Sequence, residues 1–200
     1  MPSAIITVPN TILRQQNSVV DLENDALLKT LSTQLKKTLD DKEDPKGVGI
    51  SAPQIGKNLQ AFATLLPENA NTEDFEREDM PEDAEAVSLV VYWNPKILST
   101  SPEKTFGPDP ENPIVEGCLS IPKLYAPVPR FSWVELEYVD EQLTKQVKKF
   151  HGFAARVVQH EYDHLQGMLF TDYVLQYDIP LYELRKNKFV VIDSTIAQAF

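Results

Sequence analysis

The sequence has 200 residues, 42% of them hydrophobic, and its 30 aspartates and glutamates outnumber its 19 lysines and arginines, which gives a formal charge of −11. A strongly acidic chain is a poor match for a free-standing nucleic-acid binder or for a protein held on an anionic membrane, because both contacts need an excess of basic residues. The length suits one domain with a sizeable core. No apolar run approaches the roughly 20 residues of a membrane span, and the N-terminus lacks a secretory pattern.

The acidity is concentrated in residues 68–86, which contain nine acidic residues and one arginine. The other 181 residues carry a net charge of only −3. Because this segment has few apolar residues, we expect it to form a solvated loop. Cys118 is the single cysteine, so an internal disulfide is impossible and a reducing compartment is expected.

The first half of the chain shows one helical pattern followed by strand-like runs. Leucines recur at helical spacing over 22–41, which predicts an amphipathic helix. Three glycines and a proline within 47–56 predict a special backbone path rather than a regular element. Strands are predicted at 60–66, 87–92 and 94–99.

The second half begins with a proline-rich connection, which is predicted to be rigid and irregular over 101–114. Runs rich in Val, Tyr, Phe and Trp then predict strands at 124–129, 131–139 and 144–150. The pattern next predicts a helix over 152–166, with Gly167 as its stop. A short helix near 178–187 and a strand at 188–193 are expected near the C-terminus.

The sharpest motif is His-Glu-Tyr-Asp-His at 160–164, within the predicted helix. Positions i and i+4 of a helix lie one above the other, so His160 and His164 can reach the same metal. Glu161 is turned about 100° from His160, so its carboxylate can approach a metal-bound water without ligating the metal. The order of helix, several strands and helix predicts an α+β fold, with mainly antiparallel β-sheets around a central helix that carries this motif.

A catalytic metal usually has three protein ligands, so a third ligand is needed in addition to the two histidines. The elongated metzincin pattern would place another histidine at position 170, but the sequence has Phe170. Glu183 could supply the third ligand of a gluzincin-type site. Cys118 is the other candidate, although a lone cysteine is more often a small buried hydrophobic residue. The residue pattern leaves both candidates open.

Three segments together resemble the signature motifs of the peptide deformylase family. They are Gly-Val-Gly-Ile-Ser-Ala-Pro-Gln at 47–54, Glu-Gly-Cys-Leu-Ser at 116–120 and Gln-His-Glu-Tyr-Asp-His at 159–164. They occur in the family's order and at compatible separations. The similarity spans roughly residues 4–172, and the three motifs together are far more specific than any one of them.

The resemblance implies a single catalytic domain over 1–200, with an acidic loop insertion at about 67–86. It also implies a metal-dependent hydrolase that removes the N-formyl group from the N-terminal methionine of newly synthesised polypeptides and releases formate. One divalent metal ion would be bound by Cys118, His160 and His164. Fe²⁺ is implied in the cell, and the same thiolate and imidazole donors also accept Zn²⁺, Ni²⁺ or Co²⁺.

Catalytic roles follow from the same resemblance. A metal-bound hydroxide would attack the formyl carbon, with Glu161 as the general acid/base. Gln54 and the backbone N–H of Leu119 would face the formyl oxygen and stabilise the negative charge that develops there.

The resemblance also implies a set of substrate-binding residues. Gly49 and the neighbouring backbone would bind the peptide as an added strand, and Glu116 and Gly117 also belong to the substrate-binding set. We expect the Glu116 carboxylate to pair with Arg130 or Arg156 and so to hold the cysteine loop. The methionine side-chain pocket would be lined by Val48, Ile114, Leu119 and Val157.

The implied partners are N-formylmethionyl nascent peptides, with a transient ribosome contact allowed, no membrane and no direct sequence-specific nucleic-acid binding. We expect a cytoplasmic monomer. Many relatives have an acidic residue before the first motif glycine and a basic residue after the cysteine motif, whereas this chain has Lys46 and Tyr125 there. Contacts to the peptide beyond methionine are therefore expected to differ.

Two alternative functions remain at this stage. The first is a metalloprotease that uses Glu183 with the two histidines. The second is a catalytically silent peptide-binding relative that has kept the fold. Glu161 and Gln54 argue against the silent relative, because a binding protein needs neither of them.

Overall fold

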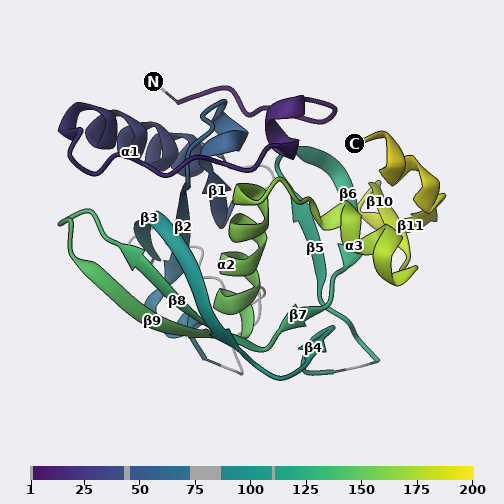
Figure 1. Ribbon diagram of the computed structural model, residues 1–200. Helices are drawn as coiled ribbons and strands as arrows, with labels where there is room; N and C mark the ends of the chain where they lie inside the picture. Colours follow the sequence, from purple (N-terminus) through teal and green to yellow (C-terminus); the bar gives the residue numbers. More distant parts are fainter. Residues whose placement is uncertain (1, 43–45, 73–86, 110) are drawn as a thin grey trace.

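A computed structural model describes residues 2–42, 46–72, 87–109 and 111–200 of the chain. The described residues form an α+β fold in which the sheets are mostly antiparallel, as predicted (Figure 1). Most of the predicted acidic loop, residues 73–86, lies outside the described residues. No helix in the described part is both long and apolar enough to cross a membrane.

The N-terminal sheet has the strand order β1-β2-β3-β8-β9 within the described residues. Its strands are β1 (Gly49–Ser51), β2 (Ala61–Pro67), β3 (Val87–Thr100), β8 (Trp133–Val139) and β9 (Lys145–His151). All neighbouring pairs are antiparallel. β2 is buried along its whole length, which fits its apolar sequence, interrupted only by Thr64.

The two faces of this sheet are covered by different helices. Helix α1 (Asp25–Asp40) packs its leucine stripe against Ala61 and Ala63 of β2, and helix α2 (Gly152–Leu165) packs against Phe62 and the other face. Successive residues of a strand point to opposite faces, so β2 serves both helices at once. The predicted helices at 22–41 and 152–166 are confirmed, with ends that differ by at most three residues, and Gly167 stops α2 with a φ of 72°.

The C-terminal sheet has the strand order β11-β10-β6-β5 within the described residues. Its strands are β5 (Val115–Cys118), β6 (Ile121–Pro127), β10 (Leu181–Arg185) and β11 (Lys188–Ile192). A small pair, β4 (Lys104–Thr105) and β7 (Arg130–Phe131), links the two regions. Helix α2 stands between the N-terminal sheet and strands β5 and β6 (Figure 1).

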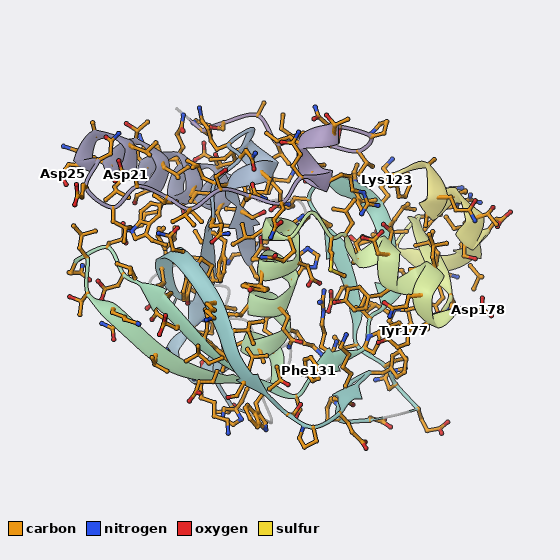
Figure 2. All side chains as sticks on the ribbon, viewed as in Figure 1. Asp21, Asp25, Lys123, Phe131, Tyr177 and Asp178 are labelled. Atoms are coloured by element: carbon orange, nitrogen blue, oxygen red, sulfur yellow. The ribbon has the colours of Figure 1, made fainter. Side chains whose placement is uncertain are left out.

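Short helices complete the described chain. They are the 3₁₀ helices Thr11–Arg14, Ala52–Ile55, Glu68–Ala70 and Ser194–Ala199, and the helix α3 (Phe170–Tyr177). Figure 2 shows Tyr177 and Asp178 at the end of α3, where Asp178 takes a left-handed conformation with a φ of 51°.

The region predicted as two separate strands differs from the structure. The strands expected at 87–92 and 94–99 form one long strand, β3, whose register shifts between Trp93 and Lys96. Asn94 has a φ of 49° there, and its side-chain amide bonds both backbone groups of Val20, at 2.7 and 2.9 Å. Asn94 therefore causes a local irregularity in β3, stabilised by its bonds to Val20, and does not end the strand.

The helix expected near 178–187 is wrong. Helix α3 ends earlier, at Tyr177, and β10 follows. Lys186 and Asn187 both have positive φ angles, 48° and 60°, and form a tight turn that pairs β10 with β11. The backbone twist of such a two-residue turn matches the twist of the two strands of a hairpin. The strand predicted at 188–193 is confirmed as β11.

Candidate metal centre

Three side chains with metal-binding atoms meet between α2 and the end of β5. The donor atoms of Cys118, His160 and His164 all lie within 4.8 Å of one another, and Sγ of Cys118 is 3.2 Å from Nε2 of His164. Ligands of a tetrahedral zinc-type site lie about 3.5 Å apart, given bond lengths of about 2.0–2.3 Å. This donor set therefore fits one divalent ion.

Local structure explains why the three donors converge. His160 and His164 are one helical turn apart on α2, which brings their ring centroids to 5.1 Å. Cys118 ends β5, where the register with β6 shifts so that Cys118 pairs with Ile121. The backbone N–H of Ser120 contacts the Cys118 sulfur at 3.4 Å and fixes the turn.

Glu116 holds His160 in the orientation that a ligand needs. Its Oε2 lies 3.2 Å from Nδ1 of His160, which leaves Nε2 for the cluster. A carboxylate on the far nitrogen commonly fixes the tautomer of a metal-binding histidine. Although burial alone would lower the pKa of His160, the hydrogen bonds that its N–H groups donate to Cys118 and Glu116 raise it well above its usual value. A bound cation would displace that proton, because only neutral imidazole ligates a metal.

The pKa of the second histidine shifts in the opposite direction, because its neighbours do not offset the effect of burial there. Burial lowers the pKa of His164 well below the ordinary value, and the neighbouring His160 lowers it further. His164 is therefore neutral near pH 7 and ready to ligate. Both histidines are well covered from solvent, which strengthens any charge interaction at the cluster.

A buried ion network ties the cysteine strand to the histidine helix. Arg130, which is only 1% exposed, donates from Nε and Nη2 to the two carboxylate oxygens of Glu116, each at 2.8 Å. Arg130 also donates to Asp163 of α2 and, at 3.3 Å, to the hydroxyl of Tyr173. Arg156 lies 3.6 Å from Glu116. The predicted pairing of Glu116 with Arg130 or Arg156 is thus confirmed for both arginines.

The charge of Glu116 is strongly favoured by this network. Burial alone would raise the pKa of the Glu116 carboxyl, but the charge and the hydrogen bonds of Arg130 lower it well below its usual value. Glu116 is therefore ionised near neutral pH. Its carboxylate is fully engaged by protein groups, so a contact to substrate from this residue would have to come from its backbone.

Glu161 is buried beside the backbone of β1. An ideal Cβ at Gly49 would lie 2.4 Å from Oε1 of Glu161 and 2.9 Å from its Cδ, so the missing side chain of Gly49 makes room for the carboxylate. Burial raises the pKa of Glu161 to about 7, although the nearby charge of His160 lowers it. Its Oε2 has no hydrogen-bond partner among the described residues. A carboxyl group of this kind can hold or release a proton near neutral pH.

Gln54 is oriented by the turn that it caps. Its Oε1 accepts hydrogen bonds from the N–H and the hydroxyl of Ser51, both at 2.8 Å. This fixes the direction of Nε2, which lies 3.2 Å from the Ser120 hydroxyl and 3.5 Å from the Cys118 sulfur. The side-chain oxygen thus has a structural role, and the amide N–H group is left beside the cluster.

The residues predicted to line an apolar pocket come from separate elements. Val157 of α2 is buried, and the half-buried Val48 packs against the same apolar cluster. Leu119 is half-buried, and a Cβ at Gly47 would lie 3.1 Å from its Cδ1. Ile114 is half-buried and lies against Gly107 rather than in that cluster. Gly117 is exposed on β5.

Glu183, the other ligand candidate, is not part of the cluster among the described residues. It lies on β10 and forms an ion pair with Arg185 at 2.6 Å. The site residues that the sequence analysis missed are Ser51, Ser120 and Tyr173. Ser51 and Ser120 lie within the two motifs, next to the residues singled out there, which was the available signal. Nothing in the sequence pointed to Tyr173.

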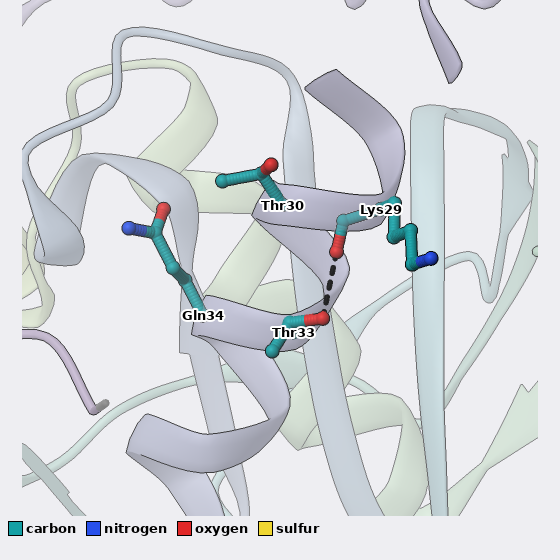
Figure 3. A pocket seen from close by; sticks show the side chains of 4 residues that line it. All are labelled: Lys29, Thr30, Thr33 and Gln34. Carbon is teal, nitrogen blue, oxygen red and sulfur yellow. Dashed lines mark hydrogen bonds between the residues drawn. The ribbon is translucent and has the colours of Figure 1, made fainter. Parts of the chain in front are cut away.

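A shallow pocket elsewhere is lined by residues of α1, namely Lys29, Thr30, Thr33 and Gln34 (Figure 3). The Thr33 hydroxyl donates to the backbone carbonyl of Lys29 at 2.7 Å, so it is already satisfied within the helix. The lining contains none of the cluster residues and no group with the chemistry of a metal ligand or an activated nucleophile.

Comparisons with known proteins agree on one family. A family model described as polypeptide deformylase matches residues 2–178. The peptide deformylase of Chlorobium phaeobacteroides is 35% identical over 168 residues, which cover 84% of this chain and 78% of the relative. The peptide deformylase of Rhizobium meliloti is 33% identical over 170 residues, covering 85% and 83%. The Met-Ala-Ser-bound crystal structure of the class I type b peptide deformylase from Acinetobacter baumannii is 30% identical, with a TM-score of 0.69 over 86% of this chain and 98% of that chain.

Proposed function

This chain belongs to the polypeptide deformylase family, an enzyme family, and from that premise we propose that it removes the N-formyl group from the N-terminal methionine of newly synthesised polypeptides and releases formate. The observation that carries the proposal is the convergence of Cys118, His160 and His164 beside the buried carboxylate of Glu161. A hydrolase needs such a base next to a site that can activate water. The engaged Glu183 favours Cys118 as the third ligand.

Cys118, His160 and His164 would hold one divalent ion, which we propose to be Fe²⁺ in the cell, with Zn²⁺, Ni²⁺ or Co²⁺ accepted by the same donors. When bound, the ion would supply a Lewis acid that lowers the pKa of water towards about 7. The chain contributes the fixed donor geometry, through Glu116 behind His160 and the Ser120 N–H behind Cys118.

We assign the proton transfers to Glu161. Its pKa of about 7 lets the carboxylate take a proton from the attacking water and return it to the departing amine. The Gln54 Nε2 group and the backbone N–H of Leu119 are the proposed donors to the formyl oxygen. Gln54 is suited to this because Ser51 already fixes its orientation, so little reorganisation accompanies the reaction.

The peptide is proposed to bind as a strand between β1 and β5. Both are outer strands of their sheets within the described residues. The Val48 carbonyl accepts from Leu65 of β2 at 2.9 Å, so strand alternation turns the polar groups of Gly49 to the free edge. Glu116 and Gly117 would contribute backbone from the opposite edge. The methionine pocket is proposed to be formed by Val48, Ile114, Leu119 and Val157.

We further propose that residues 1–200 form one catalytic domain around α2, the helix that carries the His-Glu-x-x-His motif, with the acidic insertion at about 67–86. The enzyme would act as a monomer in the cytoplasm, where formylated chains are made. Its partners would be N-formylmethionyl nascent peptides, with transient ribosome contact. No direct sequence-specific nucleic-acid binding is proposed, since the chain carries a charge of −11.

The decisive experiment is anaerobic purification, metal analysis and measurement of formate release from formyl-Met-Ala-Ser, with Glu161→Ala as the matched control. We expect about one metal ion per chain and formate release that the control lacks. Formate release no greater than that of Glu161→Ala would overturn the proposal. Cys118→Ser separates the protease alternative, because a site built on Glu183 would keep its metal and its activity.

A further inference from the structure

An aromatic ring covers the exposed glycine of the proposed substrate strand. Gly117 of β5 is directly opposite Tyr125 of β6, and an ideal Cβ at Gly117 would lie 2.5 Å from Cε1 of Tyr125. The Tyr125 ring therefore occupies the space where a side chain at position 117 would stand. The ring thus lies over β5 at Gly117, and β5 is the outer strand of the sheet, beside which a bound peptide would lie.

One aromatic ring contacts Tyr125 directly, and a second ring packs against the first. Phe189 of β11 meets Tyr125 edge to face, with centroids 5.1 Å apart, and Tyr182 of β10 lies 5.9 Å from Phe189. Tyr125 is directly opposite Tyr182, which is directly opposite Val191, so these side chains share one face of the C-terminal sheet.

This face, formed by Tyr125, Tyr182, Phe189 and Val191, is the outer face of the C-terminal sheet. Phe189 is 48% exposed and Val191 is 65% exposed. The opposite face is covered, because Leu124 and Leu181 pack into the apolar cluster with α3. The β10–β11 hairpin lies beyond residues 2–178, the part of the chain that the family model matches. Tyr182, Phe189 and Val191 therefore lie outside the part of the chain that the family model matches, whereas Tyr125 lies inside it.

Because side chains alternate between the two sides of a strand, the position of the substrate residue that would reach this face can be inferred. Glu116 and Cys118 point towards α2, since they contact His160 and His164, so Gly117 between them points the other way. Consecutive side chains of a peptide added to β5 alternate in the same manner. If the methionine side chain enters the pocket beside Val157, the side chain of the next residue points to the face that carries Tyr125.

We propose that Tyr125, supported by Phe189 and Tyr182, forms an aromatic subsite for the side chain of the second residue of the formylated peptide, and that it favours aromatic residues there. This inference rests on the proposed function. An aromatic pair typically contributes a factor of about two to ten in binding beyond its burial. A peptide with phenylalanine at position two should therefore exceed the alanine peptide in kcat/KM by about three- to tenfold, chiefly through KM.

The test compares formyl-Met-Phe-Ser with formyl-Met-Ala-Ser on the metal-loaded full chain. Tyr125→Ala should reduce the Phe/Ala ratio of kcat/KM to between about one and two. Phe189→Ala should reduce it partly, and Tyr125→Phe should keep it. Val147→Ala is the matched control, because Val147 is a 54% exposed apolar residue on β9, outside this face, and it should leave the ratio unchanged. Thermal unfolding of each variant reports whether the fold is intact.

The outcomes separate the two proposals. Formate release from both peptides with the same ratio in the wild type and in Tyr125→Ala would overturn the aromatic subsite and leave deformylation standing. Release from neither peptide would overturn both. The exposed face could instead bind a second copy of the chain, so analytical ultracentrifugation at the assay concentration measures the oligomeric state. A dimer that Phe189→Ala dissociates, together with an unchanged ratio, would assign the face to self-association instead.

Discussion

The close approach of Gly49 to Glu161 yields a sharp test of the carboxylate's position. In Gly49→Ala, the new Cβ would stand 2.4 Å from Oε1, whereas ordinary contacts begin at about 3.4 Å, so the oxygen must move by about 1 Å. Glu161 is only 3% exposed, which limits where it can go. A displacement of 1 Å in a catalytic group can cost about 10²-fold in rate. We therefore expect kcat/KM to fall about 10²-fold, with the loss in kcat.

The assay is formate release from formyl-Met-Ala-Ser at saturating and limiting substrate, with metal content measured in parallel. Gly56→Ala is the matched control. Gly56 has a φ of 75°, and its Cβ would meet nothing closer than 4.0 Å. That variant should lose about 1 kcal/mol of stability, or about 2–4 °C in Tm, while its kcat/KM stays near the wild-type value.

A double-mutant cycle refines the same prediction. Glu161→Ala removes the group that Gly49→Ala displaces, so the double variant should be no less active than Glu161→Ala alone. The reasoning would be refuted if Gly49→Ala stayed within threefold of the wild type. It would also be refuted if the two losses simply multiplied, because Gly49 would then act through something other than the carboxylate.

Three further predictions follow from the site. Glu161→Gln should lower kcat by about 10²–10⁴-fold while metal content by elemental analysis is unchanged; loss of the metal would show that Glu161 is a ligand instead. Glu116→Gln should weaken metal affinity about 10–100-fold in chelator competition, because it loosens the hold on His160, and unaltered affinity would contradict that support. Replacing residues 73–86 with a short Gly-Ser turn should keep kcat/KM within about twofold, and a large loss would place that segment at the site.

The fold was predictable wherever the pattern was local and long. The leucine repeat of 22–41 and the helical pattern of 152–166 gave the right helices, because an amphipathic stripe over four turns has few alternative explanations. The prediction of a helix over 178–187 failed because short apolar runs fit a helix or a strand equally well. What decides the structure of this segment is the turn at Lys186 and Asn187 together with pairing to β6, and that pairing is made with residues far away in sequence.

The candidate site shows the same division between local and distant information. His160 and His164 are grouped by helix geometry, which the sequence contains. Cys118 could not be chosen over Glu183 from the residues alone, because the choice depends on which strand end lies beside α2. The family resemblance implies Cys118, and the structure places its sulfur beside both histidines. The engagement of Asp163 by Arg130 was not foreseeable, since the two residues lie on different elements, 33 positions apart.

Arg130 explains how such distant parts are kept in register. Its guanidinium is 1% exposed and bonds Glu116 on β5, Asp163 on α2 and Tyr173 on α3. A buried ion network contributes little net stability, because desolvation offsets most of the attraction, but it tolerates only one arrangement of its members. Apolar packing between β5 and α2 would allow small sliding movements. The network instead joins the strand that carries Cys118 to the helix that carries both histidines, and the proposed metal site depends on that distance more than on added stability.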